Sequence, residues 1–422
     1  MIARSFNRIT AYFIFFFLFI SFNSKGQPGS SKDLENILRN NLPAYKKLFD
    51  NKFKYRLQII YIQIDRDKNN VPHFTQYDFN NNSNLFYCCA STVKLPSSIF
   101  ALEKVRQLNI NGLTKDSPML SDSAFYCQNK VFKDTTNSNC LPSIAHYIRK
   151  MLLVSDNYSF GKVYEFLTCD YLHEKFSASG FPNIRIVNKL DGACPGDTSK
   201  IAPPIYFLND LNDTIYKQSL LMRSTFNKPV PVADTKVGVA YVNENGKKAT
   251  GSRDFKNHNY ISMQDQVDIL KTLVFNSYIN STWKIDSVDR SFLLKEMGMY
   301  PRESIFPQYD PKEYYDSYKK YLLYGSMTAH INVDSLRIFN IVGRAYGFLT
   351  DCAYVVDLFH KVEFIIAATV YVNEKGVVGS GNYQYNNLGL PFMRDLGKFL
   401  YQNELKRQKE YLPNLSEFNF YH

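Results

Sequence analysis

The sequence lacks the signatures of several common enzyme classes. Its seven cysteines include no C-x-x-C pair and show no zinc-like spacing with the seven histidines. His173 and Glu174 lack the second histidine of an H-E-x-x-H motif, and no G-x-S-x-G nucleophile elbow occurs. These absences argue against a metalloenzyme and an α/β-hydrolase, and we expect neither a metal nor another cofactor.

Long apolar runs are missing after the N-terminus. Residues 1–27 place Arg4 and Arg8 ahead of an apolar run, 11–22, which is followed by small and polar residues. This layout is typical of a secretory signal peptide, and the run is short for a membrane span. We therefore expect a periplasmic or secreted protein with no stable membrane span after cleavage, an uncleaved anchor being the alternative.

Sustained blocks of like charge are also missing. The formal net charge is +11, and it falls to +8 without the signal peptide, whose charged residues are Arg4, Arg8 and Lys25. A basic protein favours anionic partners such as a cell-wall polymer. Lysines are nevertheless interspersed with acids, as in NELKRQKE, so we expect no nucleic-acid partner.

The 422 residues, 45% of them apolar, suffice for a large core. Strand-like alternation occurs near both ends of the chain, in residues 55–67, 73–79, 336–357 and 361–376. Helical periodicity is expected in the terminal segments 31–50 and 390–408 and through most of 95–170. The pattern predicts an α+β fold in which an antiparallel sheet, flanked by terminal helices, meets a helical lobe at a cleft.

The expected domain follows the signal peptide and spans residues 28–422. Its sheet lobe takes residues of about 30–90 and 320–422, and its helical lobe takes about 91–320. The segment 209–256 is expected to be an insertion containing a β-hairpin, because the turn NENGK separates two alternating runs.

Ser91-Thr92-Val93-Lys94 opens a predicted helix and has two interpretations. A serine at a helix start is an ordinary cap, and a lysine one turn later is an ordinary surface residue. The same spacing recurs at residues 159–162, 281–284 and 317–320. Alone, this spacing does not distinguish a nucleophile and its base from a helix cap.

A second motif, Ser155-Asp156-Asn157, stands at a break between helical segments. Together, Ser-x-x-Lys and Ser-Asp-Asn resemble the serine β-lactamase and penicillin-binding-protein superfamily, most of all the class A β-lactamases. The resemblance implies a β-lactamase-like fold, with Ser91 as nucleophile and Lys94 as its base. It also implies that Ser155 relays the proton and that Asn157 binds Lys94 or the substrate.

The chemistry explains these residue types. A serine hydroxyl is a poor nucleophile until a base takes its proton, and a lysine kept neutral by burial can do so. At a helix N-terminus, the Ser91 N–H also faces the developing oxyanion. Asp156 is expected to brace the loop.

The resemblance implies a third motif, Lys-Thr-Gly or Lys-Ser-Gly, on a strand lining the cleft. Ile341-Val342-Gly343 falls at this position, so the glycine is kept, allowing close backbone approach, and the lysine is replaced. The N–H of Arg344 is expected to be the second oxyanion donor. Arg344 or Lys361 is a candidate to restore the charge, and Ile341→Lys is expected to speed acylation by carboxylate-bearing β-lactams.

The resemblance also implies a loop glutamate that activates water, but the segment NKLDGACPGD has none. Asp191 and Asp197 are the carboxylates nearby, and a loop aspartate is more often a turn former than a base.

Export permits disulfides, for which Cys127 with Cys140 and Cys169 with Cys194 are the expected pairs.

Two hypotheses follow. In the first, the protein is an exported serine hydrolase acylated at Ser91 by a β-lactam, a peptidoglycan-like peptide or another amide or ester. Without a loop glutamate, its deacylation is expected to be slow. In the second, it is a catalytically degenerate binding or scaffold protein that keeps the pocket.

Overall fold

The computed structural model describes residues 31–192, 194, 196–221, 224–279, 283–328, 331 and 335–420. The expected signal peptide, residues 1–27, lies outside the described residues.

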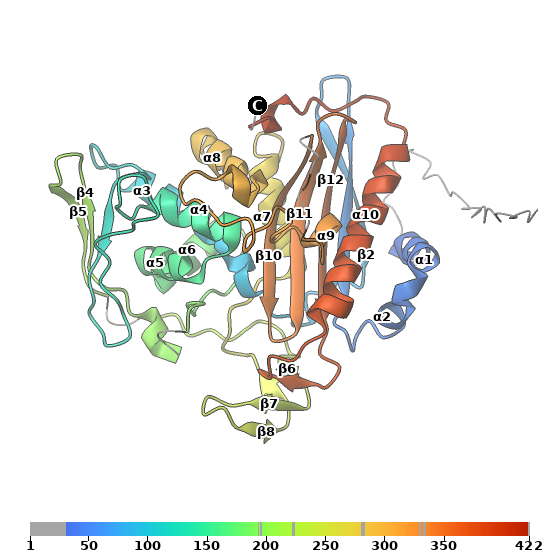
Figure 1. The fold of residues 1–422 in the computed structure, drawn as a ribbon, viewed down its shortest axis with the longest axis horizontal. Helices are drawn as coiled ribbons and strands as arrows, with labels where there is room; N and C mark the ends of the chain where they lie inside the picture. Colours follow the sequence, from blue (N-terminus) through green and yellow to red (C-terminus); the bar gives the residue numbers. More distant parts are fainter. Residues whose placement is uncertain are drawn as a thin grey trace, which may run out of the picture.

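The centre of the fold is a five-stranded sheet in the order β10-β11-β12-β1-β2 (Figure 1). All four pairs of neighbouring strands are antiparallel. Two strands come from the N-terminal part of the chain and three from the C-terminal part: β1 Gln58–Arg66, β2 Pro72–Phe79, β10 Leu336–Ala345, β11 Phe348–Asp357 and β12 Val362–Tyr371. The predicted α+β class, with strands from both ends of the chain, is confirmed.

The strand-like run 336–357 is two strands rather than one. Tyr346 and Gly347 lie between β10 and β11 with φ angles of 54° and 93°. Two consecutive positive φ angles are typical of the tight turn that joins antiparallel strands. The alternation of side chains continues across such a short turn, which is why the sequence pattern shows no break there.

Both faces of the sheet are buried. Along β1, Ile59 and Tyr61 belong to one hydrophobic cluster, whereas Ile60, Ile62 and Ile64 belong to another. Successive side chains of a strand point to opposite faces, so a run that is apolar at every position fills two cores.

Helices α1 (Ser31–Asn41) and α10 (Leu390–Lys406) cover one face of the sheet, with the short helix α2 (Lys46–Asp50) beside α1 (Figure 1). The predicted opening helix is interrupted. Pro43 starts the 3-10 turn Pro43–Tyr45 between α1 and α2, because proline cannot continue the hydrogen-bond ladder of α1.

The other face carries the helical part of the chain. This consists of α3 Lys94–Gln107, α4 Ile144–Val154, α5 Asn157–Leu167, α6 Cys169–Ala178, α7 Met263–Val274 and α8 Ser287–Gly298. Within the described part of the chain, no helix is both long and apolar enough to cross a membrane.

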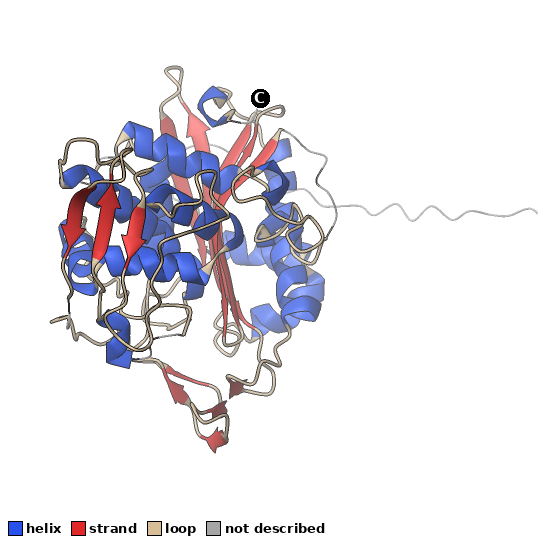
Figure 2. Cartoon of the chain, turned by 60° about the vertical axis from the view of Figure 1, so that its left-hand side comes forward, coloured by secondary structure: helices blue, strands red, loops and turns tan. Residues whose placement is uncertain are grey.

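Smaller sheets lie outside the central one, as the separate red strands of Figure 2 show. One joins β3 Met119–Ser121, β4 Ile205–Leu208 and β5 Thr214–Gln218. The others contain β6 Lys236–Val237 with β9 Arg253–Asp254, and β7 Ala240–Val242 with β8 Lys248–Thr250 and β13 Val377–Val378. The turn of the expected hairpin lies between β7 and β8, which pair antiparallel.

Candidate active site

Ser91 lies in a 3-10 turn, Ala90–Val93, that leads directly into α3. The residue before it, Ala90, has a φ angle of 46°, in the left-handed region that residues with a Cβ rarely adopt. Such backbone strain persists only where the surrounding structure holds it, and it clusters at functional sites. Ser91 itself is half-buried, so the turn holds this residue without removing it from solvent.

The two cysteines before this turn are packed rather than reactive. Both side chains are buried. Burial raises the pKa of the Cys88 thiol to about 11 and that of Cys89 well above its usual value. Since only a thiolate is strongly nucleophilic, Ser91 is the better nucleophile of this segment.

The amine of Lys94 contacts three other residues that the sequence singled out. Its Nζ lies 3.0 Å from Ser91 Oγ, 3.0 Å from Ser155 Oγ and 2.7 Å from Asn157 Oδ1. It also donates to the main-chain carbonyl of Ser155. The Lys94 residue as a whole is 0% exposed. The structure therefore joins both motifs through one buried amine.

Burial lowers the pKa of Lys94 to about 7, and the charge of Asp156 opposes this shift. A neutral amine has two N–H donors and one lone pair. The Ser155 carbonyl and Asn157 Oδ1 can only accept, so they take the two donors. The lone pair is left for a hydroxyl, as general-base action on Ser91 requires.

The Ser-Asp-Asn segment lies between two helices. Ser155 ends α4 with a φ angle of 62°, and Asp156 begins α5 by accepting a hydrogen bond of 2.7 Å from the main-chain N–H of Ser159. Asp156 is thus a helix cap that braces the segment. Asn157 is exposed at the first position of α5, with its side-chain oxygen on Lys94.

Gly343 on β10 is packed against the turn that carries Ser91. A Cβ at this position would lie 2.4 Å from the main-chain oxygen of Cys89, which is closer than atoms can approach. Only glycine allows β10 and the turn to meet in this way. The neighbouring Arg344 is exposed, with its guanidinium 5.4 Å from the centre of the Tyr385 ring. Its role as an oxyanion donor stays a prediction.

Ile341 offers no charge to the site. It is 1% exposed and belongs to the core cluster. Lys361 lies in the turn after β11, beyond the pair formed by Leu336 and Asp357. Gly343 lies seven residues after Leu336 on β10, which corresponds to about 23 Å at the rise of a strand. Lys361 therefore does not replace the motif lysine.

The two carboxylates of the loop after α6 have different surroundings. Asp197 has a side chain 92% exposed and pairs with Lys200 at 3.1 Å. The Asp191 carboxylate packs against α5, where a Cβ on Gly161 would lie 2.9 Å from its Oδ2. The side-chain hydrogen bonds of Lys94 described above join it to Ser91, Ser155 and Asn157.

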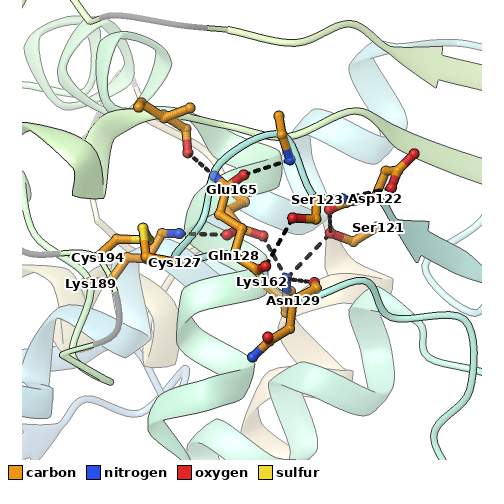
Figure 3. Close-up of polar contacts among 12 residues, drawn as sticks. Ser121, Asp122, Ser123, Cys127, Gln128, Asn129, Lys162, Glu165, Lys189 and Cys194 are labelled. Atoms are coloured by element: carbon orange, nitrogen blue, oxygen red, sulfur yellow. Dashed lines mark hydrogen bonds and ion pairs between the residues drawn. A yellow bond between two sulfur atoms is a disulfide. The ribbon is translucent and has the colours of Figure 1, made fainter.

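The loop is tied to the rest of the helical part by a disulfide and a buried charge cluster (Figure 3). Lys189 of the loop and Lys162 of α5 both pair with Glu165, which is 3% exposed. The disulfide joins Cys127 to Cys194. Both expected cysteine pairs are therefore wrong, because tertiary packing rather than sequence proximity brings Cys127 to the loop.

The remaining cysteines fit this correction. Cys140 is an exposed free cysteine. Cys169 is a buried free cysteine beside His173, and its Sγ lies 3.6 Å from the ring Nδ1. A buried thiol of this kind behaves as a small packed residue.

A family model described as the beta-lactamase enzyme family matches residues 45–403 of the chain. No curated protein matches it. Among solved structures, the chain is similar to a β-lactamase from Sphaerobacter thermophilus, with 9% identity, a TM-score of 0.45 and coverage of 88% of this chain and 98% of that one.

Two further structures show the same degree of similarity. A class A β-lactamase from Mycobacterium abscessus is 13% identical, with a TM-score of 0.44 and coverage of 88% and 99% of the two chains. A protein described as PBP-A is 11% identical, with a TM-score of 0.46 and coverage of 90% and 100%.

Proposed function

The chain belongs to the β-lactamase enzyme family, and on this premise we propose that it is an exported serine hydrolase acylated at Ser91. The substrate class is a β-lactam, a cell-wall peptide or another amide or ester. One observation carries the proposal: the buried Lys94 amine lies within hydrogen-bond distance of Ser91, Ser155 and Asn157 at once.

The geometry supports a simple sequence of proton transfers. Neutral Lys94 takes the proton of Ser91, whose Oγ forms a bond to the substrate carbonyl carbon while the carbonyl electron pair moves to oxygen. When the tetrahedral intermediate collapses, the bond to the leaving nitrogen or oxygen breaks. Ser155 gives that atom its hydroxyl proton and takes one from Lys94. The products are an acyl-enzyme, a protonated leaving group and a neutral Lys94.

Hydrolysis of the acyl-enzyme is expected to be the slow step of the reaction. It needs a base that activates water, and the loop has no glutamate: Asp197 lies in solvent and Asp191 packs against α5. We therefore expect a long-lived acyl-enzyme.

Export is part of the proposal. The layout of residues 1–27 supports it, as does the Cys127–Cys194 disulfide, because structural disulfides are typical of oxidising compartments.

The alternative is a binding or scaffold protein that keeps the fold without turnover. The buried Ile341, where the motif lysine is expected, favours this function. The two functions differ in whether a covalent bond forms at Ser91.

The test is intact-mass spectrometry of the mature protein after incubation with a reactive penicillin or a fluorophosphonate. We expect an added mass that maps to the peptide containing Ser91 and is absent in Ser91→Ala. Labelling that persists in Ser91→Ala would refute the assignment. Absence of labelling by every acylating probe at high concentration would favour the binding protein.

A further inference from the structure

A second buried lysine lies next to the site and comes from a different part of the chain. Lys319 belongs to the segment between α8 and β10 and is 7% exposed. Its Nζ donates to the main-chain carbonyls of Met151, at 3.3 Å, and Leu152, at 2.6 Å. Both carbonyls belong to the last turn of α4, directly before Ser155. The amine of Lys319 therefore holds the end of the helix that presents Ser155.

A cation is well placed at this helix end. The last carbonyls of a helix lack partners within it, and the C-terminus carries the negative end of the helix dipole. A protonated amine satisfies both conditions. Lys319 and Lys94 each face two oxygens that only accept, the Met151 and Leu152 carbonyls for Lys319 and the Ser155 carbonyl and Asn157 Oδ1 for Lys94. Lys94 also faces the hydroxyls of Ser91 and Ser155, which can donate to an uncharged amine. The hydroxyls give the lone pair of an uncharged Lys94 a partner, and the helix end favours a proton on Lys319.

The backbone of Lys319 is fixed as firmly as its amine. Its φ angle is 66°, and its carbonyl accepts a hydrogen bond of 2.7 Å from Asn340 Nδ2 on β10. The same Asn340 Nδ2 donates to Asp351 Oδ1 at 2.8 Å, and Asn340 Oδ1 accepts from Lys320 Nζ at 2.9 Å. Lys319 is thus clamped between the sheet and the end of α4.

Three charged groups act on Lys319: Lys94 from α3, Lys320 from its own segment and Asp351 from β11. Burial, and then Lys94 and Lys320, lower the pKa of Lys319 well below its usual value, and Asp351 raises it. The helix-end carbonyls oppose this shift, because they accept hydrogen bonds from the charged amine. The repulsion between Lys94 and Lys319 is mutual, so a proton on one amine disfavours a proton on the other.

We propose that Lys319 is a positioning residue of the Ser91 site, which fixes Ser155 through the end of α4 and keeps Lys94 neutral by carrying the positive charge. The inference rests on the proposed function. Lys319 thereby gives the site a cation in place of the motif lysine, which Ile341 replaces on β10. This cation comes from the segment between α8 and β10, which is distant in sequence from Ser91 and Ser155.

The direct test follows both amines by NMR in protein labelled with ¹⁵N-lysine, with Lys94→Met and Lys319→Met assigning the two signals. In the wild-type protein, Lys319 is expected to stay protonated through the pH range in which Lys94 loses its proton. Deprotonation of Lys319 at a lower pH than Lys94 would overturn the proposal. This readout needs no substrate, so a failure of penicillin to label Ser91 would refute the proposed function and leave this result independent.

Variants separate the charge from the contact. Lys319→Met removes both, and Lys319→Gln keeps a donor for the two α4 carbonyls without the charge. In both variants, the midpoint of the Lys94 titration is expected to rise by about one pH unit. The acylation rate at neutral pH is then expected to fall about tenfold. Lys312→Met, an exposed lysine of the same segment, is the matched control with an unchanged midpoint.

An unchanged Lys94 midpoint in either folded variant would contradict the proposal. A purely structural role would lower the acylation rate of Lys319→Met equally at every pH, and Lys319→Gln would restore it. If neither variant folds, the wild-type titration decides between the two outcomes, with the Lys319 signal assigned by its proximity to Met151 and Leu152 of α4.

Discussion

Lys94 Nζ lies 3.0 Å from Ser91 Oγ, and the lysine is completely buried. Burial makes the amine a base near neutral pH, and the short distance lets it act on this one hydroxyl. The pair lies at the start of α3, where the strained Ala90 and the close approach of Gly343 fix the turn.

The acylation rate is expected to rise with pH up to a midpoint near 7. Burial lowers the pKa of Lys94 to about 7 from the usual value of 10.5, and only the deprotonated amine is a base. Below the midpoint the amine is charged, and the rate falls about tenfold per pH unit. The measurement is the second-order rate constant for penicillin labelling across neutral pH. A rate that is flat there would contradict the role of Lys94.

Gly343→Ala is expected to slow acylation by about tenfold or more. The new Cβ would overlap the Cys89 carbonyl, so the turn that carries Ser91 must shift, and small displacements of a nucleophile cost large factors in rate. Overpacking of this kind also lowers the free energy of unfolding by about 1 to 3 kcal/mol.

The matched control is Gly246→Ala, in the turn between β7 and β8. There the φ angle is 73° but no atom lies within 4 Å of a new Cβ. It is expected to lose stability through backbone strain and to keep its acylation rate. Equal acylation rates in both variants would show that the contact of Gly343 with the Ser91 turn is unimportant.

Ile341→Lys is expected to destabilise the protein by several kcal/mol, because it buries an amine in the hydrophobic core. The sequence alone predicted faster acylation by carboxylate-bearing β-lactams for the same variant. Denaturant unfolding together with acylation rates for an anionic β-lactam and a neutral ester distinguishes these outcomes. A stable variant that selectively accelerates the anionic substrate would show that residue 341 can turn toward the site.

The penicillin adduct at Ser91 is expected to persist for minutes or longer. The loop has no glutamate to activate water, Asp197 is exposed, and the Asp191 carboxylate packs against α5. The measurement is the decay of the adduct mass after excess penicillin is removed. Rapid turnover by the wild-type protein would show that another base, with Asp191 the first candidate, serves deacylation.

Local patterns were sufficient to predict the α+β fold and the grouping of Ser91, Lys94, Ser155 and Asn157. Alternation marks strands, and Ser-x-x-Lys combined with Ser-Asp-Asn resembles a known arrangement, although Ser-x-x-Lys alone recurs in the chain. The turn at Tyr346 was missed because alternation continues through it. The disulfide of Cys127 with Cys194 and the contact of Lys319 with α4 depend on packing between segments distant in sequence, and no local signal encodes either.

The claim that Lys94 activates Ser91 is tested by the acylation rate of Lys94→Ala. The measurement is the second-order rate constant for penicillin labelling of Ser91, with circular dichroism to show that the fold is kept. We predict a loss of about a hundred- to ten-thousand-fold relative to wild type, and no rescue in Lys94→Arg, because a guanidinium stays protonated. A folded Lys94→Ala variant that acylates at the wild-type rate would contradict the claim.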